Sequence, residues 1–464
     1  MLEPADITDA LGSLKARQHR YRAYADYYAG VQPLHFSTDQ WHTAFGALFR
    51  RLAYNRCRPV VDAYANRLNV TGWESPTSTD PETDALGKAA MAIWDRTRMP
   101  KRQGELWTES LRAGDAYLIV WPGDDGLARL DINRGHLIEP VYDDERPERL
   151  VYAVKCWQVT SGPERGKWRV TTYDAEGITR WFSRSASKER PEKAAQLEPY
   201  GDEPEVPNEW GTVPVFAFGN NADTGMVGAS ELVDVIPLQD GVNKSVADML
   251  IAGEYVAFPQ RWVVGAAPVL NPHTNEEEEQ FKAAVDRVWA VDNEQARFGQ
   301  FDPADMTAYI AAQDAWDMKI SRVSFVPVHW LSMTGTPPSG ESLKTAEGPF
   351  VAKVRDRQTA FGATLADAMT FALRIDGALG ADAGAVVPVW QAAETRSDLE
   401  QLQQAALRKS LGIPDEQIWS ELGYSQQEIA TFQQAKAEAA QRQMEQFGQA
   451  FDRGQMQPVP AGGQ

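Results

Sequence analysis

The sequence predicts an α+β protein in which helical segments surround a region of antiparallel strands. Two changes of periodicity carry this prediction. Apolar side chains recur at helical spacing in the first 113 residues, and they alternate with polar ones from about residue 115. Helical spacing returns at residues 229–257 and after residue 303. With 464 residues, 43% of them hydrophobic, the chain can bury a sizeable core in roughly two to four domains.

The first 68 residues are expected to form helices. Asp6 or Thr8 is a suitable N-cap for the first helix, and Ser37 or Thr38 for the second. Two further helices are expected by residue 113. This part of the chain is locally basic, which fits either a solvated helical face or a face that meets an acidic neighbouring subunit.

The alternating region is expected to form successive antiparallel strands separated by Gly- and Asp-rich turns. These strands are AYLIVW, LARLDIN, HLIEPVY, RLVYAVKCWQV, KWRVTTY and ITRWFS. Residues 184–209 are charged, Pro-rich and poor in apolar side chains, so they are expected to form a loop or to be disordered. VPVFAF at 213–218 is one more expected strand.

Two helices, at 229–257 and 303–323, are predicted on either side of a small αβ insert at 258–302. The insert contains two short strand-like segments, FPQRWVVG and RVWAV. If the helices pair antiparallel, the insert forms a tip at their far end.

An uncharged loop, which contains a Trp and a Met among Gly, Pro, Ser and Thr, leads into a long predicted helix that starts at Glu341. At 1.5 Å per residue this helix spans roughly 50–60 Å, which is too long for one compact domain. Gly348 and Pro349 are expected to bend it. A strand at 386–390 and helices over 395–447 follow, and the Gln-rich end is expected to be frayed or disordered.

Charge and cysteine content restrict the function classes. The net charge of −19 and the pI of about 4.9 argue against a protein that grips nucleic acid by its phosphates. Cys57 and Cys156 lie far apart, which favours two buried thiols in a reducing compartment. The start, MLEPADITDA, has no signal-peptide pattern, and no apolar run is long enough to span a bilayer. We therefore expect the protein to be made in a cytoplasm.

Catalytic motifs are missing from the sequence. The six histidines form no i,i+4 pair, and SGPERGKW lacks the spacing of a phosphate-binding loop. No metal or other cofactor is expected. The acidic pairs that remain are typical of turns between strands, but they are also candidate metal ligands; they are Asp124 with Asp125, and Asp143 with Asp144.

Four segments resemble, in this order, the portal proteins of tailed bacteriophages, and in detail those of long-tailed phages of actinobacteria. The segments are DVIPLQDGVNKSVADMLIAGEYVAFPQRWVVG (234–265), FDPADMTAYIAAQDAWDMKISRVSFVPVHWL (301–331), PPSGESLKTAEGPFVAKVRDRQTAFG (337–362) and IPDEQIWSELGYSQQEIA (413–430). Each alone is weakly specific, whereas the four in sequence are fairly specific. With the general order of helices and strands, the resemblance covers most of the chain.

The resemblance implies a division of the chain into the parts of a portal subunit. These parts are a wing (1–228), a first stem helix (229–257), a clip (258–302), a second stem helix (303–327), a tunnel loop (328–340), a long wing helix and strand (341–390), and a crown with a flexible tail (391–464).

The resemblance also implies a non-enzymatic protein of the virion, assembled in the host cytoplasm into a ring of twelve subunits at one capsid vertex. Such a ring is the channel for packaging and ejection of double-stranded DNA, without sequence specificity. The implied partners are the major capsid protein, the terminase large subunit and the head–tail adaptor. Negative channel walls would let DNA slide, because they offer no cations to hold its phosphates.

Candidate site residues follow from this division. In the tunnel loop the DNA-facing candidates are His329, Trp330, Met333 and Thr334; alternatively, Trp330 is buried in a packed connection. In the stem the candidates are Asp240, Lys244, Asp248, Asp317, Lys319 and Arg322, either as a channel lining or as intersubunit salt bridges. In the clip, docking candidates are Arg261, Trp262, Arg287, Trp289 and Arg297, although the tryptophans also suit a small clip core.

Two other functions compete with this interpretation. One is a metal-dependent hydrolase or nuclease that uses the four turn aspartates, for which loss of activity on Asp125→Ala would be diagnostic. The other is a different structural component of the virion, such as a tail or baseplate protein.

Overall fold

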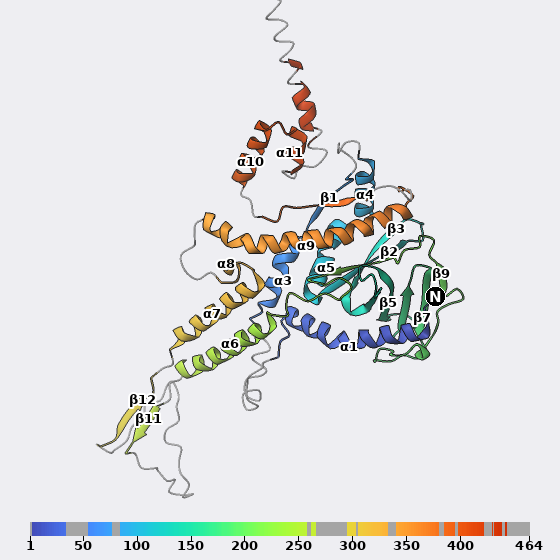
Figure 1. The fold of residues 1–464 in the computed structure, drawn as a ribbon. Coiled ribbons are helices and arrows are strands. Elements are labelled where there is room, and N and C mark those ends of the chain that lie inside the picture. Colours follow the sequence, from blue (N-terminus) through green and yellow to red (C-terminus); the bar gives the residue numbers. More distant parts are fainter. Residues whose placement is uncertain are drawn as a thin grey trace, which may run out of the picture. The chain divides into compact units, whose positions relative to one another are not determined.

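The computed structural model describes residues 2–33, 54–76, 84–257, 261–265, 295–302, 305–332, 340–379, 385–394, 398–421, 429, 431–438 and 441–442. The chain divides into two compact units, Met1–Ala393 and Glu394–Gln464. The first unit combines helices with antiparallel sheets, as the predicted α+β class requires (Figure 1).

The expected N-terminal helices are present as α1 (Pro4–Ala29), α3 (Cys57–Ala65), α4 (Ala85–Arg96) and α5 (Met99–Ala113). The first cap differs from the prediction, because Glu3 and not Asp6 or Thr8 is the N-cap of α1. Asp6 instead accepts a hydrogen bond from the Glu3 backbone N–H at 3.0 Å, which completes a capping box. The helix expected to start near Ser37 lies outside the described residues.

The predicted strands form two antiparallel sheets. A three-stranded sheet has the order β10-β2-β3, from Val215–Gly219, Asp115–Pro122 and Ala128–Arg134. The second sheet contains β4 (Ile138–Tyr142), β5 (Leu150–Gln158), β6 (Trp168–Tyr173) and β7 (Gly177–Ser183). Its strands pair in sequence order, so neighbours along the chain are neighbours in the sheet.

Residues 184–209 form a loop over most of their length, but two short strands in it were not predicted. These strands, β8 (Leu197–Pro199) and β9 (Glu205–Pro207), both pair with β7. The charged segment is held to the sheet through Arg190, which is buried. Its guanidinium donates to the His136 carbonyl oxygen at 2.9 Å and lies over the Trp168 ring.

Both faces of the three-stranded sheet are covered. Along β2, Leu118 and Val120 face the largest core cluster, which also contains residues of α3, α5 and α9 (Gly340–Ile375). The alternate residues Tyr117 and Ile119 face the second sheet. A third cluster lies between α1 and the other face of the second sheet, where it buries Cys156. Because β2 is covered on both sides, its residues from Asp115 to Val120 are all buried.

The two cysteines are free thiols, and both are buried as expected. Burial raises the pKa of Cys57 and of Cys156 to about 12, so both remain protonated at neutral pH.

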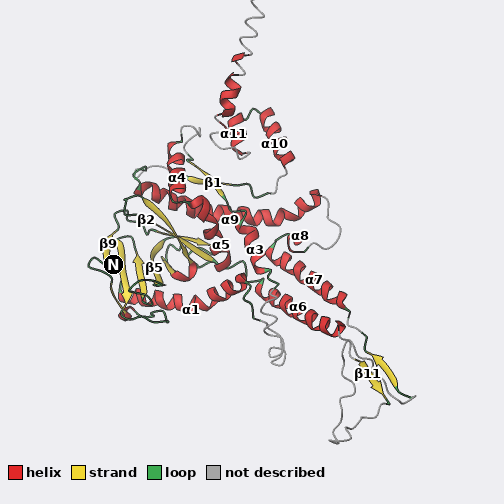
Figure 2. Ribbon diagram, turned by 180° about the vertical axis from the view of Figure 1, so that it is seen from behind, coloured by secondary structure: helices red, strands yellow, loops and turns green. Residues whose placement is uncertain are grey.

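Helices α6 (Ile236–Ala257) and α7 (Met306–Ser324) lie side by side, with an antiparallel pair of short strands, β11 (Arg261–Val264) and β12 (Arg297–Gln300), beyond them (Figure 2). Helix α6 starts seven residues later than the predicted 229, because turns precede it. The second predicted strand, RVWAV, lies outside the described residues.

The long helix α9 has 36 residues, about 54 Å at 1.5 Å per residue, and contains Pro349. It is preceded by a short helix, α8 (Val328–Leu331). The strand expected at 386–390 is β13 (Val387–Trp390), and it pairs with an unpredicted strand, β1 (Val70–Glu74).

The second unit contains α10 (Asp398–Ser410) and α11 (Asp415–Glu421). Asp415 forms ion pairs with Lys409 at 3.2 Å and Lys436 at 2.5 Å, and Trp419 packs edge-on against Phe432.

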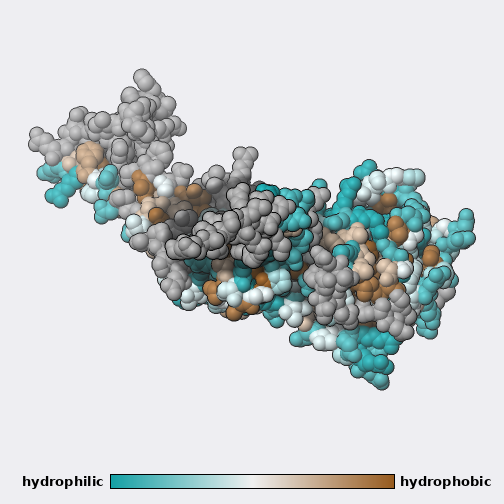
Figure 3. All heavy atoms as spheres, turned by 90° about the horizontal axis from the view of Figure 1, so that it is seen from above, coloured by the Kyte–Doolittle hydropathy of each residue, from teal (hydrophilic) through white to brown (hydrophobic). Residues whose placement is uncertain are grey.

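The coloured residues in Figure 3 show a mixed surface, with small groups of hydrophobic residues between hydrophilic ones. Among the residues that the structure describes, no helix is long and apolar enough to cross a membrane.

Candidate functional site

The helices α6 and α7 pair through a glycine that faces a tryptophan. A Cβ atom at Gly241 would lie 2.9 Å from two ring carbons of Trp316, so the indole occupies space that only glycine leaves open. The Trp316 Nε1 group donates a hydrogen bond to Ser245 Oγ at 2.9 Å. The Lys319 ammonium lies 4.0 Å from the centroid of the same ring. These contacts fix the register of the two helices.

Replacing Gly241 with alanine is expected to destabilise the protein by about 1–3 kcal/mol, because the new methyl group overpacks the indole contact. Thermal unfolding at a fixed protein concentration measures the effect. Gly253→Ala is the matched control on the same helix, since a Cβ there has no neighbour within 4 Å. Alanine favours helix formation, so the control should keep or raise the stability. Equal effects of the two substitutions would contradict the proposed contact.

An ion pair joins α7 to the segment before α3. The Arg56 guanidinium contacts Asp317 through two hydrogen bonds, Nε to Oδ1 at 2.8 Å and Nη2 to Oδ2 at 2.6 Å. The Asp317 side chain is only 2% exposed and that of Arg56 13%. The guanidinium also lies 4.0 Å from the centroid of the Tyr54 ring. A buried carboxylate is stable only when it is paired in this way.

A chain of amide and hydroxyl groups joins the first two turns of α6 to the end of α1 and to residues 54–56. Gln239 and Asn243 have no exposed surface, and their side chains hydrogen-bond to each other at 2.9 Å. Gln239 accepts from the Arg56 backbone N–H at 2.7 Å, and Asn243 donates to Gln32 at 2.9 Å. Asp240, the residue after Gln239 on α6, accepts a hydrogen bond from the Tyr27 hydroxyl at 2.6 Å.

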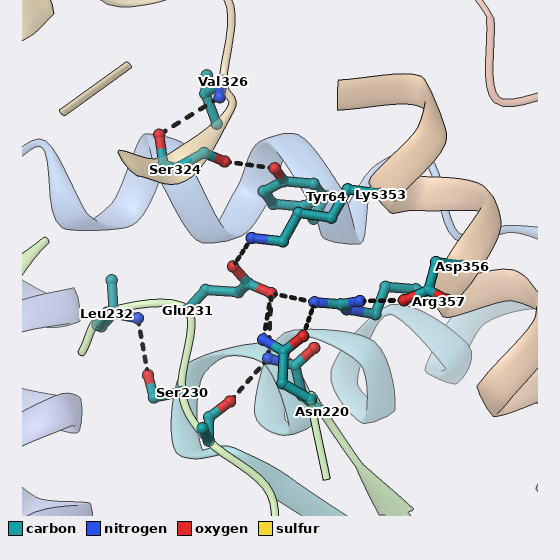
Figure 4. A network of polar contacts seen from close by, with 12 residues as sticks. Tyr64, Asn220, Ser230, Glu231, Leu232, Ser324, Val326, Lys353, Asp356 and Arg357 are labelled. Atoms are coloured by element: carbon teal, nitrogen blue, oxygen red, sulfur yellow. Dashed lines mark hydrogen bonds and ion pairs between the residues drawn. The ribbon is translucent and has the colours of Figure 1, made fainter. Parts of the chain in front are cut away.

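The buried Glu231, which precedes α6, is the centre of a polar network with α9 (Figure 4). Its carboxylate accepts from Lys353 Nζ at 2.5 Å and from Arg357 Nη2 at 3.1 Å. Lys353 and Arg357 are one helical turn apart on α9, so both cations reach the same carboxylate. Asn220 Nδ2 also donates to Glu231, at 3.1 Å.

The end of α7 is fixed beside this network. The Tyr64 hydroxyl of α3 donates to the Ser324 carbonyl oxygen (Figure 4). Phe325 then adopts the left-handed conformation, with φ of 60°, and ends the helix. Both members of the helix pair are therefore anchored to the core through buried polar groups, and their orientation is set at that base.

The short helix α8 lies between α7 and α9. Trp330 packs edge-on against Phe350 of α9, with ring centroids 5.1 Å apart, and 37% of the residue remains exposed. The Arg67 guanidinium lies 5.7 Å from the Trp330 ring centroid. His329 Nε2 is 3.7 Å from Glu347 of α9. One part of the Trp330 ring thus packs on Phe350 and the rest is exposed. The sequence allowed a DNA-facing or a buried ring, and this arrangement combines features of both. Met333 and Thr334 lie outside the described residues.

Two of the six predicted stem residues are used inside the chain. Asp240 and Asp317 are buried on Tyr27 and Arg56, which differs from the prediction that they line a channel or meet a neighbouring subunit. The physical reason is that a buried carboxylate needs a partner, and here the partner comes from the same chain. The other four are at or near the surface, and among them are an ion pair, Lys244 with Asp248, and the exposed Lys319 and Arg322.

Some of the predicted clip residues lie in the strand pair β11–β12. Trp262 of β11 pairs in register with Gly299 of β12, and a Cβ at Gly299 would lie 2.3–2.8 Å from the indole. The ring therefore lies across the facing strand, yet Trp262 is 38% exposed. Arg297 is also exposed. Nothing is described of the Arg261 side chain, and Arg287 and Trp289 lie outside the described residues.

The four turn aspartates serve the local backbone where their contacts are described. Asp125 accepts from the Leu127 N–H, and Asp143 accepts from the N–H groups of Glu145 and Arg146. These backbone hydrogen bonds lower the pKa of Asp143. Within the described ranges, no group of three or more His, Cys, Asp or Glu residues is placed to hold a metal ion.

Among the residues that anchor the helix pair, the sequence pointed to Asp240 and Asp317 but not to Glu231, Arg56 or Arg357. Glu231, Arg56 and Arg357 stand in the sequence like any other charged residues, and their partners are more than a hundred residues away. The one local signal is that Glu231 and Asp317 interrupt apolar runs, which marks a charge on a buried face.

Comparison with known proteins gives matches over most of the chain. The family model described as "Phage portal protein, SPP1 Gp6-like" matches residues 13–445. The portal proteins of Mycobacterium phage L5 and Mycobacterium phage D29 are each 25% identical to this chain, over 232 and 230 residues. These matches cover 48% and 47% of this chain and the same shares of the relatives, so the chain spans about half the length of the relatives it matches.

Two solved structures also match over most of this chain. A chain of the virion of a native gene transfer agent particle is 14% identical, with a TM-score of 0.39, over 84% of this chain and 91% of that chain. A chain from the neck of an empty gene transfer agent particle is 15% identical, with a TM-score of 0.41, over 85% of this chain and 92% of that chain.

Proposed function

The chain belongs to the SPP1 Gp6-like family of phage portal proteins, and we propose that it forms a ring at one vertex of the capsid through which DNA is packaged and ejected. The observation that carries this proposal is the extent of the family match, from residue 13 to 445. The matched residues include the helix pair α6 and α7, the strand pair β11–β12, α8 and α9. The family is one of virion structural proteins, and the hydrolase alternative has no comparable support.

In the proposed assignment, α6 and α7 belong to the stem, the strand pair β11–β12 to the clip, and α8 to the tunnel loop. The two sheets and helices α1, α3, α4 and α5 belong to the wing, and residues 391–464 to the crown and tail. A stem must hold one angle to the rest of the subunit if twelve copies are to close a ring. The buried groups at its base, among them Asp317 and Glu231, supply such a constraint.

The charge balance agrees with a conduit more than with a DNA-binding surface. Twelve copies of a chain with net charge −19 carry about −228 in total. Each phosphate contact made by Lys or Arg adds affinity that slows sliding, so an acidic ring favours passage. Half-exposed pairs such as Lys244 and Asp248 neutralise each other on the stem surface. They remain candidates for contacts with DNA or with a neighbouring subunit.

The proposed partners follow from a place at the capsid vertex. The wing would contact the major capsid protein, and the clip would dock first the terminase large subunit and later the head–tail adaptor. For this docking we propose Arg261, Trp262, Arg287, Trp289 and Arg297. Assembly would take place in the host cytoplasm.

Electron microscopy of particles that carry a tagged copy of this chain tests the proposed location. We expect extra density at a single vertex of each capsid. Density on the tail or baseplate, or at all vertices, would contradict the proposal and favour a different structural role.

Replacing Trp330 with alanine is expected to leave rings intact and to reduce the number of DNA-filled particles by at least about tenfold. The reason is that the exposed part of the indole is the bulkiest described group of the proposed tunnel loop. The yield of filled particles is counted by electron microscopy after complementation. Trp330→Phe is the matched control, since it keeps an aromatic ring against Phe350. Normal packaging by intact Trp330→Ala rings would mean that the residue is only structural.

A further inference from the structure

A half-open cavity of about 240 Å³ lies between the two sheets of the first unit. At one end of the space between them the side chains are apolar and close-packed, among them Tyr117, Ala153 and Tyr173. Further along the same strands the lining becomes cationic and aromatic. Lys155 and Trp157 follow on β5, Arg169 and Thr171 lie on β6, and Trp121 lies at the end of β2.

Strand register places two cations of the cavity in one row. Lys155 of β5 lies opposite Thr171 of β6, and Thr171 lies opposite Arg180 of β7. Residues directly opposite on neighbouring strands are about 5 Å apart, so Lys155 and Arg180 are separated by roughly 10 Å at their backbones. Their long side chains can converge on one anion above the small Thr171.

Within the described residues, no ion pair neutralises the charges of this row. In the described part of the chain, neither Lys155 nor Arg180 has a carboxylate within ion-pair distance. The Lys155 ammonium lies 4.8 Å from the centroid of the Trp157 ring, which also lines the cavity. The third cation, Arg169, is already paired, with Glu164 at 2.7 Å and the Tyr200 hydroxyl at 2.5 Å.

Burial also affects Lys155. It lowers the pKa of the ammonium group, and the Asp131 carboxylate acts in the opposite direction. A half-buried cation of this kind gains from a bound anion, which restores part of the favourable interaction that the ammonium lost with water.

We propose that this cavity binds a carboxylate side chain of an acidic peptide segment of a partner protein. Lys155 and Arg180 hold the carboxylate, and the rings of Trp121 and Trp157 contact an apolar neighbour of the acidic residue. The inference does not rest on the ring proposed above, because the cavity lies within one subunit.

Size and charge favour a peptide over nucleic acid as the ligand. A cavity of about 240 Å³ accommodates one or two side chains, whereas a duplex needs an extended cationic surface that meets several phosphates. The aromatic wall adds a contact that suits an apolar side chain.

Fluorescence anisotropy with two peptide pools tests the proposal on the full-length protein. One pool contains acetylated five-residue peptide amides with Glu at the second and fourth positions and Leu, Val or Phe elsewhere. Its twin has Gln in place of Glu, and both carry the same uncharged dye. We expect the acidic pool to bind at least about tenfold more tightly than its twin. Lys155→Met and Arg180→Gln should each weaken its binding by a similar factor, because each removes one cation and keeps most of the apolar stem.

Lys188→Met is the matched control, since Lys188 is exposed and does not line the cavity. It should bind both pools like the unaltered protein, and thermal unfolding should show that all three variants are folded. Equal binding of the two pools would overturn the proposal. So would unchanged binding by Lys155→Met and Arg180→Gln, or no binding up to about 1 mM. Displacement of the acidic pool by a short DNA duplex at lower concentration than by unlabelled acidic peptide would assign the cavity to nucleic acid instead.

Discussion

Replacing Glu231 with alanine is expected to lower the free energy of unfolding by about 3–5 kcal/mol, the largest effect of any single substitution considered for this chain. The carboxylate is buried between Lys353 and Arg357. Its removal takes the ion-pair partner from Lys353 and, among the described residues, leaves Arg357 paired only with the exposed Asp356. Arg357 has almost no exposed side-chain surface, so water cannot replace the lost acceptor.

Thermal unfolding at equal protein concentrations measures this effect, since stability of an oligomer depends on concentration. Asp234→Ala is the control, because Asp234 is an exposed acidic residue three positions away. It should change stability by less than about 0.5 kcal/mol. If Glu231→Ala were as mild as Asp234→Ala, the network in Figure 4 would not anchor α9 to the base of α6.

Replacing Asp317 with asparagine is expected to cost about 3 kcal/mol and to loosen α7 from the core. The substitution keeps the shape of the side chain but leaves the Arg56 guanidinium buried without a countercharge. Hydrogen exchange should then increase along α7 more than in the sheets, because the helix loses its charged anchor.

The double variant Arg56→Met/Asp317→Leu separates the ion pair from other effects. Replacing a buried pair by apolar residues of similar size is often nearly neutral, so the double variant should be more stable than Asp317→Asn alone. If it were less stable, α7 would be anchored mainly by the packing around this position and not by the charge pair.

Periodicity was enough to predict most elements of the first unit. The strands from residue 115 to 183 and the long helix α9 repeat their apolar side chains over enough residues to be read locally. The family was also evident from four segments in sequence, and the match over residues 13–445 confirms it. The short strands β1, β8 and β9 were missed, because three to five residues carry no reliable period, and β1 also pairs with a strand more than 300 residues away.

The base of the helix pair was beyond sequence reasoning for a related reason. Helical spacing placed Asp240 on one face with Lys244 and Asp248, and Asp317 stood among mixed charges on the second helix. Their partners Tyr27 and Arg56 are 213 and 261 residues away. A charge on a helix can be solvated, paired with another subunit or buried on a distant partner, and spacing alone does not distinguish these states. The cavity between the sheets also depends on register, which places Lys155 and Arg180 in one row.

The central claim is that this chain assembles into a ring with an axial channel. Negative-stain imaging and native mass spectrometry of the purified full-length protein test it most directly. We predict ring-shaped particles with a central hole, and a twelve-subunit ring would have a mass of about 618 kDa, twelve times 51.5 kDa. A stable monomer at micromolar concentration, with no rings at any salt concentration, would contradict the claim.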